Sequence, residues 1–127
     1  MTKQVIRTDD APTPTGPFNQ AIRAGNLVFT AGQAGRNRST GQMGDIRDQA
    51  RRAIGNIEAI LKAAGSSLEQ VVKVTVYLRN PEDAPAFNEE YKKLMPEPLP
   101  ARASAYVNLK TPDMLVEMDA IAVIPEP

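Results

Sequence analysis

The chain has 127 residues, of which 42% are apolar and 24% charged, as in an ordinary globular protein with one core. It contains no cysteine and no histidine, which excludes cysteine nucleophiles, disulfides, imidazole bases and metal sites built on those ligands. Its 15 basic and 15 acidic residues cancel, and no stretch approaches the ~20 apolar residues that span a bilayer, so we expect neither nucleic acid nor membrane as a partner.

The N-terminal segment predicts a short edge strand followed by a loop. The first ten residues, MTKQVIRTDD, lack the apolar run of a signal peptide, which leads us to expect a cytoplasmic protein. Residues 3–7 fit a short strand. Residues 10–17 contain three prolines, which deny backbone donors and therefore predict a loop.

A β-hairpin and a glycine-rich loop are predicted next. Segments 18–24 and 27–31 flank Gly25-Asn26, a pair typical of a two-residue turn in which both residues have positive φ. Residues 32–44 (GQAGRNRSTGQMG) predict a loop. Because this loop has neither the GxxxxGK[ST] nor the GxGxxG pattern, it gives little support to a phosphate site.

The first long helix is predicted to begin after Asp45, whose carboxylate can cap the first backbone N–H groups. Apolar residues then recur at steps of three and four along one face: Ile46, Ala50, Ala53, Ile54, Ile57, Leu61 and Ala64. Gly65 suits the left-handed position that ends such a helix.

The second half of the chain predicts three strands and one further helix. Residues 71–78 (VVKVTVYL) are rich in β-branched side chains and predict a central strand. A helix over 83–94 carries one apolar stripe: Ala84, Phe87, Tyr91 and Leu94. Strands over 99–109 (LPARASAYVNL) and 115–124 follow. The order predicts a single α+β domain over residues 1–127, with two layers, a mostly antiparallel sheet and two helices on one face.

Both faces of strands 71–78 and 115–124 are more apolar than exposure to water would favour. Helices can cover only one face of the sheet in a two-layer domain. The sequence therefore predicts that the other face meets a second copy of the chain.

Few side chains remain that could carry chemistry, and Arg102 is the first of them. The alternation in 99–109 predicts a half-buried strand with Arg102 on its polar side, between the small residues Ala101 and Ala103. Its guanidinium either forms a surface ion pair or offers two parallel donors to a ligand carboxylate. Glu117 and Asp119 share one face of the last strand, and a carboxylate near Arg102 would position water or move a proton.

Six segments follow one another along nearly the whole chain: TGPFNQAIRAGNLVFTAGQ (15–33), AAG (63–65), VVKVTVYL (71–78), FNEEY (87–91), PARASAYV (100–107) and VEMDAIAV (116–123). In this order they resemble the reactive-intermediate deaminase family, RidA, also called YjgF. The resemblance implies a chorismate-mutase-like fold and a homotrimer with ligand clefts between subunits. It also implies hydrolysis of 2-imino and 2-enamino acids to 2-keto acids and ammonia, with no metal and no cofactor.

The resemblance also assigns site residues. Arg102, in the PAR motif, matches the arginine that grips the substrate carboxylate. Glu117 matches the acid thought to hold or activate water. Gly32 matches a glycine whose backbone contacts the ligand, and Asn88 matches an asparagine of the pocket.

Two further pocket positions depart from the family pattern. Phe18 stands where the family usually has tyrosine, so the ring is kept and the hydroxyl is missing. Ser104 stands where cysteine is frequent, so a small polar group is kept and the thiol is missing. Both are expected to line the substrate pocket and to affect its polarity.

The favoured hypothesis is a cofactor-independent deaminase-like hydrolase, in which Arg102 clamps the substrate carboxylate and Glu117 positions water. One alternative is a regulatory module that binds 2-keto acids or other small carboxylates without turnover. A second alternative, RNA cleavage or inhibition of translation, is disfavoured by the zero net charge and the missing histidine.

Overall fold

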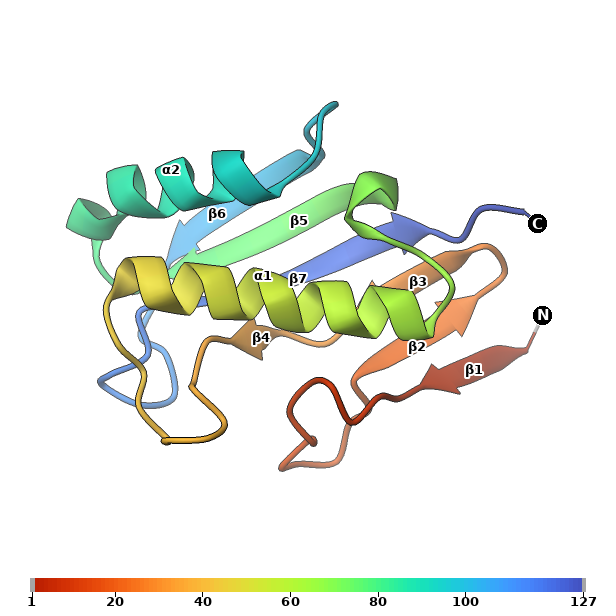
Figure 1. Cartoon of the computed structure of the whole chain (residues 1–127), viewed down its shortest axis with the longest axis horizontal. Coiled ribbons are helices and arrows are strands. Elements are labelled where there is room, and N and C mark those ends of the chain that lie inside the picture. Colours follow the sequence, from red (N-terminus) through yellow and green to blue (C-terminus); the bar gives the residue numbers. More distant parts are fainter. Residues whose placement is uncertain (1, 127) are drawn as a thin grey trace.

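A computed structural model describes residues 2–126 as one sheet with two long helices (Figure 1). The strands are β1 Lys3–Ile6, β2 Ala21–Ala24, β3 Leu27–Thr30, β4 Gln33–Ala34, β5 Val71–Leu78, β6 Ala101–Tyr106 and β7 Val116–Val123. The helices are α1 Ile46–Ala63 and α2 Ala84–Leu94, and two 3-10 turns are η1 Leu68–Gln70 and η2 Pro81–Asp83. No helix within residues 2–126 is long and apolar enough to cross a membrane.

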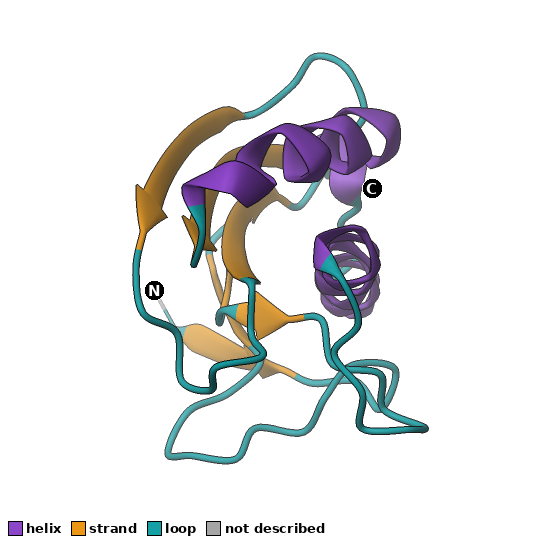
Figure 2. Ribbon diagram, turned by 90° about the vertical axis from the view of Figure 1, so that its left-hand side faces the viewer, coloured by secondary structure: helices purple, strands orange, loops and turns teal. Residues whose placement is uncertain are grey.

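The strands lie in the order β1-β2-β3-β7-β5-β6, and the short β4 also pairs with β7. Every pairing is antiparallel except that of β5 with β6, which is parallel. Both helices lie on the same side of the sheet (Figure 2). The predicted two-layer α+β architecture is therefore confirmed.

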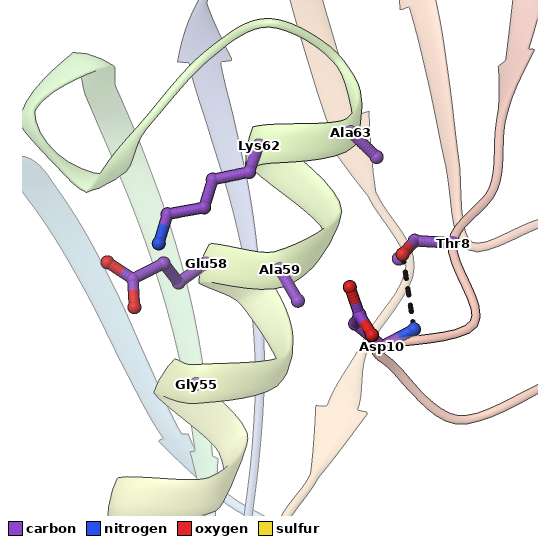
Figure 3. Close-up of a pocket in the computed structure, with 7 residues that line it drawn as sticks. All are labelled: Thr8, Asp10, Gly55, Glu58, Ala59, Lys62 and Ala63. Carbon is purple, nitrogen blue, oxygen red and sulfur yellow. Dashed lines mark hydrogen bonds between the residues drawn. The ribbon is translucent and has the colours of Figure 1, made fainter.

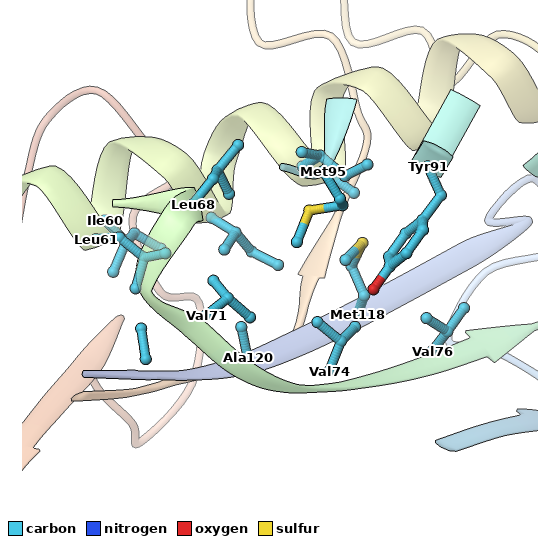
Figure 4. Close-up of a cluster of buried hydrophobic side chains, with 14 of the residues drawn as sticks. Ile60, Leu61, Leu68, Val71, Val74, Val76, Tyr91, Met95, Met118 and Ala120 are labelled. Atoms are coloured by element: carbon cyan, nitrogen blue, oxygen red, sulfur yellow. The ribbon is translucent and has the colours of Figure 1, made fainter. Parts of the chain in front are cut away.

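The main core lies between the helices and the sheet (Figure 4). Helical side chains such as Ile60, Leu61 and Tyr91 point toward alternate residues of β5 and β7, including Val74 and Met118. The apolar helix stripes and the inward positions of the strands thus meet across one interface, and burying them removes their apolar surface from water.

Helix α1 begins and ends where the sequence predicts. Asp45 accepts a hydrogen bond from the backbone N–H of Asp48 at 2.9 Å, and the Asp48 carboxylate accepts one from the Asp45 N–H at 3.2 Å. This reciprocal capping box satisfies two otherwise free donors. Gly65 follows the helix with a φ of +82°, the left-handed conformation that suits glycine.

The predicted hairpin is confirmed, but its turn conformation is corrected. Ala24 pairs directly with Leu27, which leaves the two-residue turn Gly25-Asn26. Gly25 has a φ of +61°, whereas Asn26 does not have a positive φ. Positive φ at both turn residues was therefore a wrong prediction, because a turn of the type II′ class needs it only at the first.

The predicted loop over 32–44 contains β4, which the sequence did not reveal. Ala34 of β4 pairs with Glu117 of β7, and Gln33 pairs with Met118. Gly35 follows this strand, and a Cβ there would overlap the Gln49 carbonyl oxygen of α1. Glycine thus lets the chain pass directly against the helix backbone.

Strand β6 is not half-buried as predicted. Only Arg102 is half-buried, and the other five residues of the strand are exposed. The strand lies at the edge of the sheet, so it has a single neighbouring strand. Its alternation shows two chemically different faces, and helix α2 covers only Arg102, through Phe87 and Tyr91.

The sheet face opposite the helices carries a mostly apolar row of side chains, called the apolar row below, that crosses five strands. Register pairing connects Val5, Ile22, Phe29, Ile121 and Lys73 in that order. Phe29 is 40% exposed and Val5 60% exposed, although both are apolar. Lys73 is the one charged side chain of this row, so the row has the composition of a contact surface.

Candidate functional site

Arg102 is held by aromatic rings of α2. Its guanidinium carbon lies 4.9 Å from the ring centroid of Tyr91 and 5.3 Å from that of Phe87. These distances fit cation–π contacts, which stabilise the guanidinium without neutralising its charge. The rings belong to core side chains four residues apart on α2, so they lie on one helix face.

Arg102 is also bound by its neighbour on β6. Its Nε donates a hydrogen bond to Ser104 Oγ at 3.0 Å. Within residues 2–126, no carboxylate lies within 4.0 Å of its guanidinium, so the surface ion pair expected as one alternative is not formed there. Asn88 is exposed on α2, directly after Phe87.

Glu117 lies against the backbone of Gly32. A Cβ placed on Gly32 would be 2.6 Å from Glu117 Oε2 and 2.9 Å from its Cδ. Any larger residue would push the carboxylate aside, so glycine permits this contact. Because β4 pairs Ala34 with Glu117, the strand that follows Gly32 fixes the arrangement.

A hollow of about 280 Å³ opens at this carboxylate and is lined by Phe18, Gly32 and Glu117. Its walls also include residues 12–15 and Met114. Phe18 is 45% exposed, which is unusual for a phenylalanine ring in a chain this size and leaves its face open to a ligand. Asp119, the other acid of the last strand, is absent from this lining, and burial raises its pKa.

The structure therefore divides the six predicted residues into two groups. Arg102 pairs with Val74 of β5, and Glu117 pairs with Tyr77 of the same strand. Val74 and Tyr77 are three positions apart, an odd spacing that places their side chains on opposite faces of the sheet. Arg102 faces the helices, Glu117 faces the uncovered side, and one chain does not bring the two together.

Sequence reasoning missed several residues of these groups. Phe87 and Tyr91 were predicted as core, which they are, but their contact with Arg102 depends on the packing of α2 over β6. Arg36 and Lys110 line the hollow beside Glu117. Both lie in irregular segments, where no periodicity indicates the direction of a side chain.

A second hollow, of about 390 Å³, lies between α1 and the loop after β1 (Figure 3). Thr8 and Asp10 face the helix there, opposite Gly55 and Ala59. Although it is larger, it is lined by none of the six predicted residues. The smaller hollow is the better candidate because it holds the carboxylate, the close glycine backbone and the exposed ring together.

Comparisons with known sequences agree over almost the whole chain. Residues 8–124 match the family described as Endoribonuclease L-PSP. A RutC family protein of Pyrococcus abyssi is 48% identical over 124 residues, which cover 96% of this chain and 98% of the relative. A 2-iminobutanoate/2-iminopropanoate deaminase of Dermatophagoides farinae is 40% identical over 124 residues, which cover 96% and 97%.

Solved structures show the same fold. E. coli TdcF with bound serine superposes with a TM-score of 0.88 at 35% identity, covering 94% of this chain and 98% of that chain. RidA from the Antarctic bacterium Psychrobacter sp. superposes with a TM-score of 0.89 at 38% identity, covering 95% and 99%. Identity above 30% over nearly the full length relates these chains by sequence as well as by fold.

Proposed function

The chain belongs to the endoribonuclease L-PSP family, which includes RidA, YjgF and TdcF and has the chorismate-mutase-like fold, and on this premise we propose that it hydrolyses 2-imino and 2-enamino acids to 2-keto acids and ammonia. A relative at 40% identity carries the name of such a deaminase. The observation that carries the proposal is the pair of uncompensated charges, Arg102 on one sheet face and Glu117 on the other.

These two charges meet only if the site is shared between copies of the chain. We propose a homotrimer in which each cleft combines Glu117, Gly32 and Phe18 of one protomer with the partner subunit's Arg102. The partner subunit's Ser104 and the partner subunit's Asn88 would complete the pocket. The apolar row on the uncovered sheet face supports an assembly through that face.

In the proposed reaction, the guanidinium binds the substrate carboxylate through two parallel N–H donors. Glu117 accepts a hydrogen bond from a water molecule and directs its oxygen at C2 of the imine, beside the Gly32 backbone. Addition of water gives a carbinolamine. A proton moves to its nitrogen, the C2–N bond breaks, and ammonia and the 2-keto acid leave. Carbon is neither oxidised nor reduced, so the reaction requires no redox cofactor.

The catalytic contribution of the protein would be positioning and electrostatics, because a protonated imine carbon is already electrophilic. Removing one partner of a buried, hydrogen-bonded charge pair costs about 2–5 kcal/mol. At about 1.4 kcal/mol per factor of ten, the clamp is expected to contribute a factor of roughly 30 or more to the rate.

The test is release of ammonia and pyruvate from 2-iminopropanoate generated in situ. We expect the wild type to accelerate hydrolysis and Arg102→Ala to lose at least about 30-fold in kcat/KM. Arg102→Lys should also lose activity, because an ammonium lacks the planar fork. Glu117→Gln should lower kcat more than it raises KM. Arg7→Lys, at an exposed ion pair with Asp9, is the matched control and should be unchanged. Full activity in Arg102→Lys would exclude the clamp.

Phe18 favours one alternative function, a module that binds 2-keto acids without turnover. Its ring lines the hollow but has no hydroxyl to orient water or substrate. If that absence limits catalysis, Phe18→Tyr should raise turnover without tightening the binding of 2-oxobutanoate. Tight binding of 2-oxobutanoate, with no imine hydrolysis by either protein, would instead favour the binding module.

A further inference from the structure

Lys110 brings a positive charge to the Glu117 hollow that the proposed reaction does not use. It lines this hollow together with Gly32 and Glu117. Within residues 2–126 its ammonium forms no hydrogen bond and no ion pair with a carboxylate, Glu117 included. The hollow thus contains a cation that is available to a ligand.

The loop that carries Lys110 is fixed by Arg79 at the end of β5. Nη2 of Arg79 donates to the carbonyl oxygens of Leu109 at 2.9 Å and of Thr111 at 2.7 Å, the two neighbours of Lys110. Its Nε donates to the Met114 carbonyl at 2.8 Å. Three hydrogen bonds from one guanidinium hold the backbone on both sides of Lys110, so its Cα has a set position at the hollow.

Two other charged residues near Lys110, Asp113 and Arg36, are paired with each other. Asp113, three residues after Lys110, accepts a hydrogen bond from Thr111 and lies 3.6 Å from Arg36 Nη2. Arg36 also donates to the Gly41 carbonyl at 2.7 Å. The acid closest in sequence therefore has other partners, and Arg36 is held by two contacts of its own. Lys110 is left as the uncompensated cation of this half of the site.

From these contacts we propose that the preferred substrates are 2-imino acids with a second carboxylate on the side chain, which Lys110 binds. The inference rests on the proposed function. The partner subunit's Arg102 would take the carboxylate next to the imine, and the side chain would extend toward Lys110. A substrate with a neutral side chain would gain nothing from the charge of Lys110 or from the Arg79 hydrogen bonds that hold the Lys110 loop in place.

The size of the hollow agrees with a longer substrate. The hollow measures about 280 Å³, near the lower end of about 300–1,000 Å³ found for small-molecule sites. 2-Iminopropanoate has six non-hydrogen atoms, whereas 2-iminoglutarate has ten. A second carboxylate in this hollow would be repelled by Glu117, and the positive charge of Lys110 would offset that repulsion.

The experiment compares two stable 2-keto acids that differ only at the chain end, 2-oxoglutarate and 2-oxopentanoate. Titration calorimetry on the wild type is expected to show 2-oxoglutarate binding about five- to tenfold more tightly, the effect of one partly exposed charge contact. Lys110→Met keeps an unbranched side chain without charge and should reduce this ratio to about one. Lys110→Arg should restore it, and 0.5 M NaCl should weaken it.

The matched control is Lys3→Met on β1, at the opposite edge of the sheet, which should leave both dissociation constants unchanged. The kcat/KM values for 2-iminoglutarate and 2-iminopentanoate should show the same preference. Equal affinities of the wild type for the two keto acids, or equal losses of affinity for both in Lys110→Met, would overturn this inference. Hydrolysis of 2-iminopentanoate would in that case still support the proposed function. Absence of binding and of hydrolysis with every ligand would overturn both.

Discussion

Arg102 is positioned by contacts that leave its charge uncompensated. The rings of Phe87 and Tyr91 cover its guanidinium, and Ser104 occupies one of its five donors. The ends of the fork remain available to a ligand. An arginine held this way loses less rotamer entropy on binding than one that moves freely in solvent, which favours a role in recognition.

The buried hydroxyl of Tyr91 is the energetically unfavourable group in this arrangement. Its oxygen is buried without a hydrogen-bond partner among residues 2–126, and burial raises its pKa. Tyr91→Phe keeps the ring and removes the unpaired group, so we expect the free energy of unfolding to stay equal or rise by about 1 kcal/mol, measured with urea. KM should not change.

Tyr91→Leu removes the ring as well and should raise KM, because Arg102 loses a cation–π contact. A marked loss of stability in Tyr91→Phe would contradict this interpretation, since it would mean that the hydroxyl has a partner in the assembled protein.

At the scale of elements, two glycines near α1 make a matched pair. A Cβ on Gly35 would overlap the Gln49 carbonyl oxygen and lie 2.5 Å from its Cα, both of them backbone atoms that cannot move aside. A Cβ on Gly55, within α1, would meet nothing within 4 Å. Gly35→Ala should lower the free energy of unfolding by roughly 3 kcal/mol or more.

Gly55→Ala should raise that free energy by about 0.5–1 kcal/mol, because alanine is the better helix former. Both changes add the same methyl group. Equal effects of the two variants on the free energy of unfolding, measured with urea, would therefore contradict the packing of β4 against α1.

The two helices are also connected by charge. Glu90 of α2, only 5% exposed, contacts Arg47 Nη1 at 3.3 Å and Arg51 Nη1 at 3.4 Å on α1. Burial by itself would raise the pKa of Glu90. The hydrogen bond from Arg47 and the charges of Lys93, Arg51 and Arg47 outweigh it and lower the pKa below its ordinary value of 4.5.

A lowered pKa means that ionised Glu90 favours the folded state. Its contribution to stability is complete above about pH 4.5 and is lost as the pH falls through the folded pKa. Glu90→Gln should therefore reduce the acid-induced loss of stability, measured as urea midpoints between pH 6 and pH 3. Glu97→Gln, at an exposed carboxylate, is the control, and an identical pH dependence in all three proteins would exclude this ion-pair cluster.

Elements with a local signal were predicted well from the sequence. The stripe and caps of α1 and the β-branched run of β5 depend on neighbours in the chain. Strand β4 was missed because it has two residues and exists only through its pairing with β7. The exposure of β6 was also missed, because long-range topology determines which strand lies at the edge of a sheet.

At the scale of the whole molecule, the pairing register decides where the site lies. Gly32 and Glu117 lie against each other, whereas Arg102 lies on the opposite face of the sheet. The alternation of polar and apolar residues shows which side chains of one strand share a face, but not how that face relates to the faces of other strands. Strands β6 and β7 both pair with β5, so whether Arg102 and Glu117 share a sheet face depends on both pairing registers. No pattern in the sequence specifies these two registers.

Assembly through the uncovered face gives a further prediction. Phe29 is 40% exposed in the middle of the apolar row, so Phe29→Glu should leave the chain folded and break the contact between copies. Sedimentation should show the wild type at about 41 kDa, three times the 13.8 kDa chain, and the variant as a monomer.

The control for this change is Lys62→Glu, on the exposed side of α1, which should stay assembled. A variant Phe29→Glu that sediments with the wild type would exclude this face as the interface.

The central claim is that each site combines Glu117 of one protomer with the partner subunit's Arg102. It is tested most directly by mixing two inactive variants, Arg102→Ala and Glu117→Gln, refolding them together and measuring hydrolysis of 2-iminopropanoate. In randomly mixed assemblies, roughly a quarter of the sites would have both wild-type side chains, so we expect about a quarter of the wild-type activity. Mixed assemblies with no more activity than the separate variants would contradict the shared site.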